Sequence, residues 1–336
     1  MRRVAGAAVV LLVFAAGARA QTTDSAATAP IADTAGVKRL PPISLPTDSA
    51  IMHGVSATNV GTTTLGDCSS HRQGVPLIRA GVGGAFVTGN AILWHYFKKA
   101  WWSGEKARHF FFHADWDQDF RDQDKFGHML GGYQLTRVGH DALKYACVSE
   151  NKAQLISAAY AEFFQLQIEV FDGHYAKYGF SYPDVLANTA GMVWAVAQRR
   201  HPKLEAIKPT MSYHETAALR NRANYPTELR PSLDYSGQTY WFSTDVNALL
   251  PDDAKKFWPA AIRFSVGHSV TDWISSENGQ GIRAKRRILL SFDIDPEHLP
   301  GNNHAWKQIK HQLSYYHFPA PALQLTPSWN GIAWYR

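Results

Sequence analysis

The stretch SYPDVLAN at residues 181–188 fixes one helix start more clearly than any other part of this chain. Ser181 is suited to cap a helix, Pro183 is tolerated in a first turn, and Asp184 stands three residues after the cap, as in a capping box. The predicted helix ends near Arg200, because basic side chains suit the negative helix end and Pro202 stops it. Two further helices are predicted upstream, over residues 125–145 and 152–171.

The composition of the chain changes along its 336 residues. Residues 1–20 combine two early arginines, an apolar run and a small-x-small end, which predicts a secretory signal peptide. Residues 21–77 are rich in Thr, Ala, Ser, Pro and Gly and are expected to form a disordered linker. Residues 78–209 are predicted to form a helical core, and residues 210–336 a mixed C-terminal subdomain packed on that core.

The pattern becomes extended after Pro209. Residues 234–243 combine a turn with an aromatic run, and residues 261–266 alternate with period two. Residues 287–294 and 322–325 also have the composition of strands. The predicted fold class is therefore α+β and helix-dominant, with at least three packed helices and a small C-terminal set of strands.

Two features of the chain leave alternatives open. The apolar run at residues 81–97 contains four glycines, which lower its helix propensity, and it ends before Lys98 and Lys99. It is either a buried helix or a helix that contacts a membrane. Cys68 and Cys147 are the only cysteines, so they either form one disulfide in an oxidising compartment or stay apart.

The charge of the chain argues against a nucleic-acid partner. Removing residues 1–20 takes away three arginines and leaves 31 basic residues against 28 acidic ones, so the net charge falls from +6 to +3. The mature chain is expected in the periplasm or at the outer membrane. Its expected partner is a membrane surface or another envelope protein, since it has 11 tryptophans and ends in Trp334-Tyr335-Arg336.

Polar side chains recur at helical spacing in three short segments. Each segment places two of them four or seven residues apart, and therefore on one helix face. The pairs are Asp124 with His128, Glu162 with Glu169, and Asp184 with Asn188. We expect the three faces to converge, with Asp124, His128, Glu162 and Glu169 as candidate catalytic residues. The candidate structural or binding residues are Lys125, Asp172, Ser181, Asp184 and Asn188.

Two interpretations of this cluster stay open. In the first, the polar groups only hold three helices in register, since acids near helix starts commonly serve as caps. In the second, His128 is a general acid or base that Asp124 orients, and Glu162 or Glu169 binds a metal or activates water. One histidine among carboxylates favours a hard or borderline ion, so a divalent metal is a possible cofactor.

The acidic turn at residues 115–119 does not have the sequence of an EF-hand. Asp115, Asp117 and Asp119 begin like a calcium loop, but Phe120 stands where glycine is needed and Phe126 where glutamate is needed. A looser cation site and a solvated or helix-capping turn are the two alternatives. The zinc motif His-Glu-x-x-His and the nucleophile motif Gly-x-Ser-x-Gly do not occur.

Four motifs in order along the chain point to one family. They are Asp124-Lys125-x-Gly127-His128, Glu169-x-x-Asp172-Gly173, Gly179-Phe180-Ser181-x-x-Asp184 with Asn188 and Gly191, and the segment 234–241. Through these motifs the chain resembles the bacterial domain-of-unknown-function family 2279, described as predicted periplasmic lipoproteins, over residues 80–336. The resemblance implies an envelope location and a helical core, and it supplies no activity. The chain departs from the family description because no cysteine directly follows its N-terminal apolar run.

Two of these elements, Asp-Lys-x-x-His and Ser-x-x-Asp-x-x-x-Asn, are also similar to those of VanZ-like membrane proteins. The expected function is that of an exported envelope protein, non-catalytic or membrane-associated, with a buried Asp/His/Glu/Asn cluster. The alternative is an envelope hydrolase or transferase that acts on a lipid or cell-wall fragment, using His128 with a carboxylate-bound metal or water. The sequence does not decide whether the chain is an enzyme.

Overall fold

The computed structural model describes residue 68 and residues 74–102, 104–221, 233–277 and 280–335, which all belong to one compact unit. The expected signal peptide lies outside the described residues. The expected linker does too, except for Cys68 and residues 74–77. Structure was expected to begin near residue 78, and the first described helix begins at Val75, with Pro76 in its first turn. Proline is favoured there because its missing N–H has no partner in a first turn.

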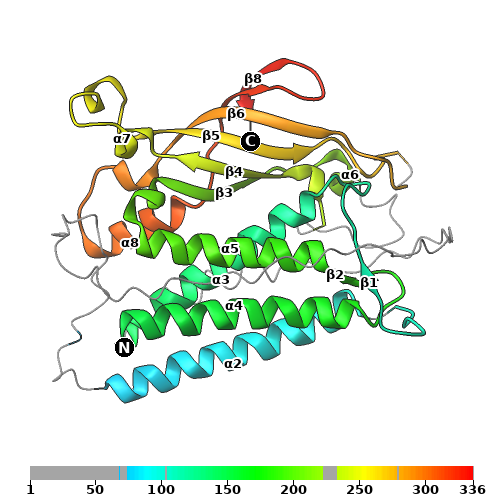
Figure 1. The fold of residues 1–336 in the computed structure, drawn as a ribbon. Helices are drawn as coiled ribbons and strands as arrows, with labels where there is room; N and C mark the ends of the chain where they lie inside the picture. The colour runs from blue at the N-terminus through cyan, green and yellow to red at the C-terminus, as the bar shows by residue number, and fades with distance from the viewer. Residues whose placement is uncertain (1–67, 69–73, 103, 222–232, 278–279, 336) are drawn as a thin grey trace, which may run out of the picture. The chain divides into compact units, whose positions relative to one another are not determined.

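Four long helices form one layer of the fold (Figure 1). They are α2 (Val75–Ala100), α3 (Gln123–Tyr145), α4 (Glu150–Asp172) and α5 (Tyr182–Arg200). Helix α3 packs along both α4 and α5. The predicted start of α5 is confirmed, because the Asp184 backbone N–H donates to the Ser181 hydroxyl at 3.1 Å.

Helix α2 packs against α4 through aromatic rings, with Phe86 on Tyr160 and Trp94 on Phe171. The disulfide between Cys68 and Cys147 ties the chain before α2 to the end of α3. Only 6% of the apolar window of α2 is buried, so the alternative of a buried helix is excluded. The segment Val75–Lys99 is long and apolar enough to cross a membrane, judged by length and composition alone.

The second layer is a six-stranded sheet in which neighbours along the chain pair antiparallel. The predicted α+β, helix-rich class is confirmed. Strand β3 begins at Ile207, so it runs across the predicted boundary between residues 209 and 210. The strands are β3 (Ile207–Tyr213), β4 (Gln238–Thr244), β5 (Ile262–Val270), β6 (Arg286–Ile294), β7 (Ala320–Gln324) and β8 (Asn330–Tyr335).

Smaller elements lie between the long helices and between the strands. Two of them, β1 (Phe112–His113) and β2 (Phe180–Ser181), form a short parallel pair, and β2 directly precedes α5 in the chain. The others are the helices α6 (Ala217–Arg220), α7 (Val246–Leu249) and α8 (His304–Leu313) and the 3₁₀ turns η1 (Pro202–Ala206), η3 (Tyr235–Gly237), η4 (Lys255–Phe257) and η5 (Pro296–His298).

The sheet buries a mainly polar face and exposes an apolar one. Across β4, β5, β6 and β7, the register places Phe242 opposite Val266, Val266 opposite Leu290, and Leu290 opposite Leu323. Val266 and Leu323 in this row are exposed. The opposite face is buried and carries small polar side chains and one ion pair beside an apolar cluster of Trp241, Leu289, Ala322 and Tyr335. Its buried polar members include Thr210, Ser243, Arg263, Ser265, Ser291 and Asp293.

A network of hydrogen bonds satisfies the buried polar face. Arg263 donates to both carboxylate oxygens of Asp293, at 3.1 and 2.5 Å, and both side chains are almost fully buried. Ser265 hydrogen-bonds Ser243 at 2.8 Å and donates to Asp293 at 3.3 Å. Because an unpaired buried charge is costly, the bidentate geometry of this pair is what permits a charged interior.

The sheet is attached to the start of α3 through Gln123 and His268. The Gln123 amide donates to the Gln238 carbonyl at 2.8 Å, so its oxygen accepts from His268 Nδ1, also at 2.8 Å. The imidazole of His268 also stacks on Phe126, with ring centroids 4.3 Å apart. Burial, reinforced by the nearby Arg286 guanidinium, lowers the pKa of His268 to about 4.

This junction makes the stability of the fold depend on pH. Between pH 6.5 and about 4 the unfolded chain protonates His268 and the folded chain does not, so stability is full above pH 6.5 and falls with pH. The shift corresponds to a loss of about 3 kcal/mol. Denaturant unfolding at pH 7 and pH 4.5 should show a smaller acid loss in His268→Gln than in the parent chain. The exposed control His304→Gln should behave like the parent, and equal losses in all three proteins would contradict the assignment.

Candidate functional site

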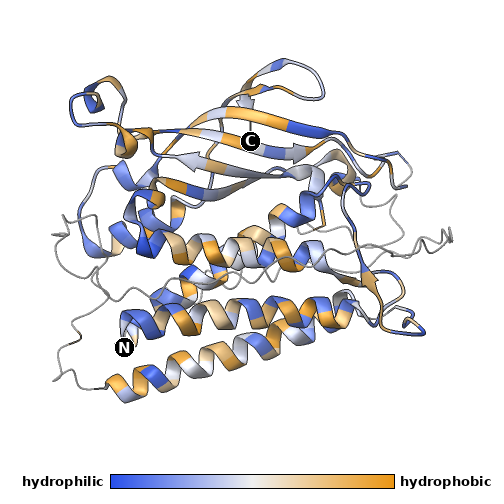
Figure 2. Cartoon of the chain, in the orientation of Figure 1, coloured by the Kyte–Doolittle hydropathy of each residue, from blue (hydrophilic) through white to orange (hydrophobic). Residues whose placement is uncertain are grey.

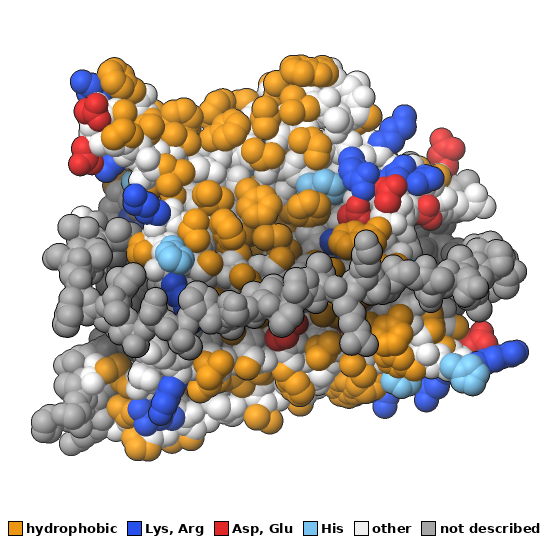
Figure 3. All heavy atoms as spheres, in the orientation of Figure 1, with side chains coloured by type: hydrophobic (Ala, Val, Ile, Leu, Met, Phe, Trp, Pro, Cys, Tyr) orange, Lys and Arg blue, Asp and Glu red, His pale blue; other side chains and the backbone are white. Residues whose placement is uncertain are grey.

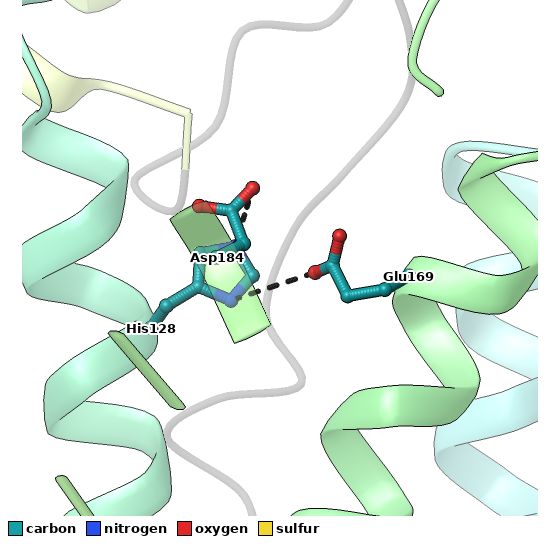
Figure 4. A group of neighbouring side chains, drawn as sticks. All are labelled: His128, Glu169 and Asp184. Carbon is teal, nitrogen blue, oxygen red and sulfur yellow. Dashed lines mark ion pairs between the residues drawn. The ribbon is translucent and has the colours of Figure 1, made fainter. Parts of the chain in front are cut away.

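Three helices each direct one ionisable side chain to a common point. His128 comes from α3, Glu169 from α4 and Asp184 from α5, and Figure 4 shows the imidazole between the two carboxylates. Close packing of α3 on α5 depends on two glycines. A Cβ at Gly132 would lie 2.3 Å from the Asn188 carbonyl oxygen, and one at Gly191 would lie 1.9 Å from that of Met129. Any larger residue at either position would push the two helices apart.

The two ring nitrogens of His128 face different partners. Nδ1 lies 3.0 Å from Asn188 Oδ1 and 3.8 Å from Glu169 Oε1. Nε2 lies 3.8 Å from Asp184 Oδ2, which is beyond hydrogen-bond distance. One ligand atom from each of His128, Glu169 and Asp184 lies within 4.8 Å of the other two, so the group has the dimensions of a metal site.

The tautomer of His128 follows from its neighbours. With its amide oriented to satisfy its surroundings, Gln165 donates to Asn188 Oδ1 at 2.7 Å and accepts from the Gly132 N–H at 3.1 Å. Asn188 Oδ1 is therefore an acceptor, and the hydrogen bond to His128 must be donated by Nδ1–H. In a neutral imidazole, Nε2 then carries a lone pair that faces the Asp184 carboxylate.

A second acidic group lies beside the group of His128, Glu169 and Asp184, and it surrounds Lys125. The Lys125 ammonium lies 2.5 Å from Asp115, 2.8 Å from Asp124 and 2.9 Å from Asp184. These carboxylates raise the pKa of Lys125 well above its usual value despite the opposing effect of burial. Asp184 belongs to both groups, because its Oδ1 faces Lys125 and its Oδ2 faces His128.

Burial raises the pKa of three acids of the cluster. Burial, assisted by repulsion from Asp184, raises the pKa of Glu169 to about 8 and that of Asp124 to about 6. Burial also raises the pKa of Asp172 to about 7. For His128, burial opposes the charged form, but the carboxylates of Asp184 and Glu169 outweigh it and raise its pKa. Perturbed groups of this kind concentrate at functional sites and in buried ion networks.

Most of the residues predicted from the sequence meet at this cluster, and Glu162 stands apart. Ser181 donates from its backbone N–H to Glu169 at 3.3 Å and from its hydroxyl to Asp115 at 2.7 Å. Asp172 accepts a hydrogen bond from the Trp102 indole at 2.6 Å. Glu162 lies two helical turns before Glu169, about 10 Å along the axis, and accepts from Thr189 at 2.9 Å. The catalytic roles considered for these residues stay predictions.

Asp115 belongs to the cluster, although the sequence pointed only to the acidic turn. The parallel pairing of His113 with Ser181 brings the two segments together, and Asp115 follows two residues later. Asp117 points elsewhere, pairing with Arg121 and Arg286 at 2.6 and 2.9 Å. Asp115 and Asp117, two acids of the looser cation site considered for residues 115–119, therefore lie in different surroundings. Helical spacing gives no signal for a contact that spans 66 residues.

The cluster coincides with the part of the chain that is similar to a known family. The model of the family described as predicted periplasmic lipoprotein, domain of unknown function 2279, matches residues 117–199. The resemblance inferred from the motifs is confirmed over this range, which contains every candidate residue named from the sequence. No curated protein and no solved structure matches the chain. The weaker similarity to VanZ-like proteins stays a prediction.

Substitution of Lys125 tests whether its ammonium stabilises the fold by neutralising the three carboxylates around it. Lys125→Met should lower the free energy of unfolding by about 3–5 kcal/mol at pH 7, since it leaves buried acids without their cation. Lys144→Met is a control on the same helix, because Lys144 pairs with the half-exposed Glu150 and should cost less than about 1 kcal/mol. The deficit of the Lys125 variant should shrink at pH 5, where the acids protonate more readily. Equal losses in both variants, or a deficit that ignores pH, would refute this role.

Proposed function

We propose that this protein works in contact with lipid in the bacterial envelope, with the apolar surfaces of its helices and sheet against the acyl region. The observation that carries the proposal is the partly inverted polarity of both layers. Large apolar side chains lie on the exposed faces, and polar side chains fill much of the interior beside small apolar clusters. In water this arrangement forfeits hydrophobic stabilisation, whereas in lipid the apolar exterior is solvated and polar side chains hold the interior together.

Helix α4 shows the inversion most clearly. Its exposed stripe consists of Leu155, Phe163, Leu166 and Val170, and Phe163 is 57% exposed. The buried residues of the same helix are mostly small or polar. They are Ala153, Gln154, Ser157, Ala161, Phe164, Gln165 and Glu169. Hydrophobic and hydrophilic residues therefore alternate along the helix, as Figure 2 shows.

Helix α5 also exposes apolar side chains on one face and buries polar ones on the other. Leu186 and Val193 are 58% and 53% exposed and lie seven residues apart on one face. The opposite face is buried and carries Asp184, Asn188, Gly191, Ala195 and Gln198. Small residues that permit close helix contact, together with buried polar groups, are typical of helix interfaces in membranes.

The outer face of the sheet continues the apolar surface. Phe292 and Ile294 are about half exposed, at 50% and 49%, and Trp334 is 63% exposed. Figure 3 shows hydrophobic side chains over the middle of one face of the described residues and charged side chains mainly toward its ends. Soluble monomers rarely expose so extended an apolar surface. Aromatic residues such as Trp329 and Trp334 are suited to the boundary between lipid and water.

Lipid accounts for these observations better than a single protein partner does. A protein partner would have to cover α2, α4, α5 and the sheet together, whereas lipid adapts to any apolar surface. The exposed segment Val75–Lys99 independently has the hydropathy of a membrane-contacting helix. The family description as a predicted periplasmic lipoprotein supports a place at the envelope.

A second candidate function is a hydrolase or transferase that acts on a lipid or cell-wall fragment. One observation favours it: the His128 side chain is 25% exposed while its partner Glu169 is 2% exposed. The one catalytic side chain that would transfer a proton is thus the member of the cluster that a substrate could reach.

Vesicle flotation of the purified mature chain tests contact with lipid. The parent chain should float with phosphatidylethanolamine–phosphatidylglycerol vesicles, and Phe163→Glu should weaken this binding about tenfold or more, because it replaces an exposed aromatic side chain that would enter the lipid with a charge. Asn151→Glu adds the same charge to the exposed first turn of α4 and should leave flotation unchanged. A parent chain that stays monodisperse without detergent and does not float would overturn the proposal. Equal flotation of Phe163→Glu and the parent would do the same.

A further inference from the structure

We propose that His128, Glu169 and Asp184 bind one divalent cation of borderline character, such as Zn²⁺ or Mn²⁺, and that Asn188 holds the imidazole in the ligating orientation. The proposal stands on the geometry of the cluster and not on contact with lipid. Nitrogen and carboxylate ligands together suit ions of this class.

The first argument is that two acceptors face each other. Asn188 takes the Nδ1–H of His128, so the lone pair of Nε2 points toward Asp184 Oδ2 at 3.8 Å. Two acceptors at this distance need a cation or a proton between them. A histidine whose other nitrogen donates to an oxygen is also the usual arrangement of a metal ligand, because that bond fixes the tautomer and the ring.

The second argument is the balance of charge. Asp115, Asp124, Asp184 and Glu169 converge here, and among the described residues Lys125 is the one lysine or arginine in ion-pair contact with them. In the group formed by Asp115, Asp124 and Asp184, the ammonium of Lys125 supplies the positive charge that a metal ion could otherwise supply. The adjoining group has the same shared carboxylate but no such ammonium. A divalent ion there would complete the neutralisation that Lys125 begins.

The third argument is the spacing of the ligand atoms. Zinc bonds to nitrogen and oxygen are about 2.0–2.2 Å long, so two ligand atoms on one ion lie at most about 4.3 Å apart. The Nε2 atom of His128 lies 3.8 Å from Asp184 Oδ2, which is too long for a direct hydrogen bond and short enough for an ion in between. One ligand atom from each of His128, Glu169 and Asp184 lies within 4.8 Å of the other two, so a small closure brings all three to one ion.

An unsatisfied donor at the site gives independent support for a ligand. Asn188 is 1% exposed, and its Nδ2 has no hydrogen-bond partner among the described residues. Leaving such a group unpaired costs about 1–3 kcal/mol. An oxygen of a water or substrate bound at the site would supply the missing acceptor. Three protein ligands leave at least one coordination position open, as in catalytic zinc sites.

Metal titration of the chelator-treated mature chain tests this site with ions alone. Isothermal titration with Zn²⁺ and Mn²⁺, together with elemental analysis of the untreated protein, should show one saturable ion for each chain. Glu169→Gln keeps the shape of the side chain and should weaken that binding at least tenfold, as should His128→Gln. Asn188→Leu should weaken it about tenfold to a hundredfold, the usual effect of removing a group that orients a ligand.

A matched control separates this site from a second acidic group. Asp245, Asp295 and His298 also place ligand atoms within 4.8 Å of one another, so His298→Gln removes a histidine from a comparable but more exposed cluster. It should leave the stoichiometry and the affinity unchanged. Circular dichroism and melting curves confirm that each variant is folded before it is titrated.

Three results would overturn the metal site: no saturable binding by the folded parent chain up to millimolar ion, binding that survives Glu169→Gln, or binding lost in His298→Gln. In the first case a protonated His128 between two acids would be the cation of the cluster. Vesicle flotation by the same preparations distinguishes this failure from a failure of lipid contact, because Phe163→Glu lies on the outer stripe of α4 and should bind the ion normally.

Discussion

The folded structure depends on neutralising buried carboxylates where α3, α4 and α5 meet. The ammonium of Lys125 lies within 2.9 Å of three of them, contributed by the acidic turn, by α3 and by α5. Each of these segments would repel the others without it, because charges at such distances interact strongly in a poorly hydrated interior. These ion contacts therefore help to set the position of the three helices at this end of the layer.

The same principle recurs in the sheet. Arg263 and Asp293 form a buried bidentate pair beside a row of serines, and a row of apolar side chains faces outward. Polar contacts are directional, so they specify a unique arrangement of elements even when the apolar surface is turned outward. The proposed contact with lipid and the proposed cation site both rest on this one distribution of polarity.

Local signals in the sequence predicted the helices well. Ser181, Pro183 and Asp184 mark the start of α5, and the spacing of Asp124 with His128 and of Asp184 with Asn188 gave faces that do converge. Long-range pairings carried no such signal. Asp115 reaches the cluster through a two-residue ladder, and the strands that begin at Ile207 and Asn330 lack a clear alternation of polarity. The inversion of the sheet was also hidden, because period two shows that two faces differ without showing which one is buried.

The disulfide between Cys68 and Cys147 gives the helical layer a covalent frame. The chain between the two cysteines contains α2, β1 and α3, so the bond closes these elements into a single ring. A backbone cut anywhere inside that ring would leave the two fragments joined. Helix α2, which has little buried surface of its own, is thereby kept beside α4 by topology as well as by its aromatic contacts.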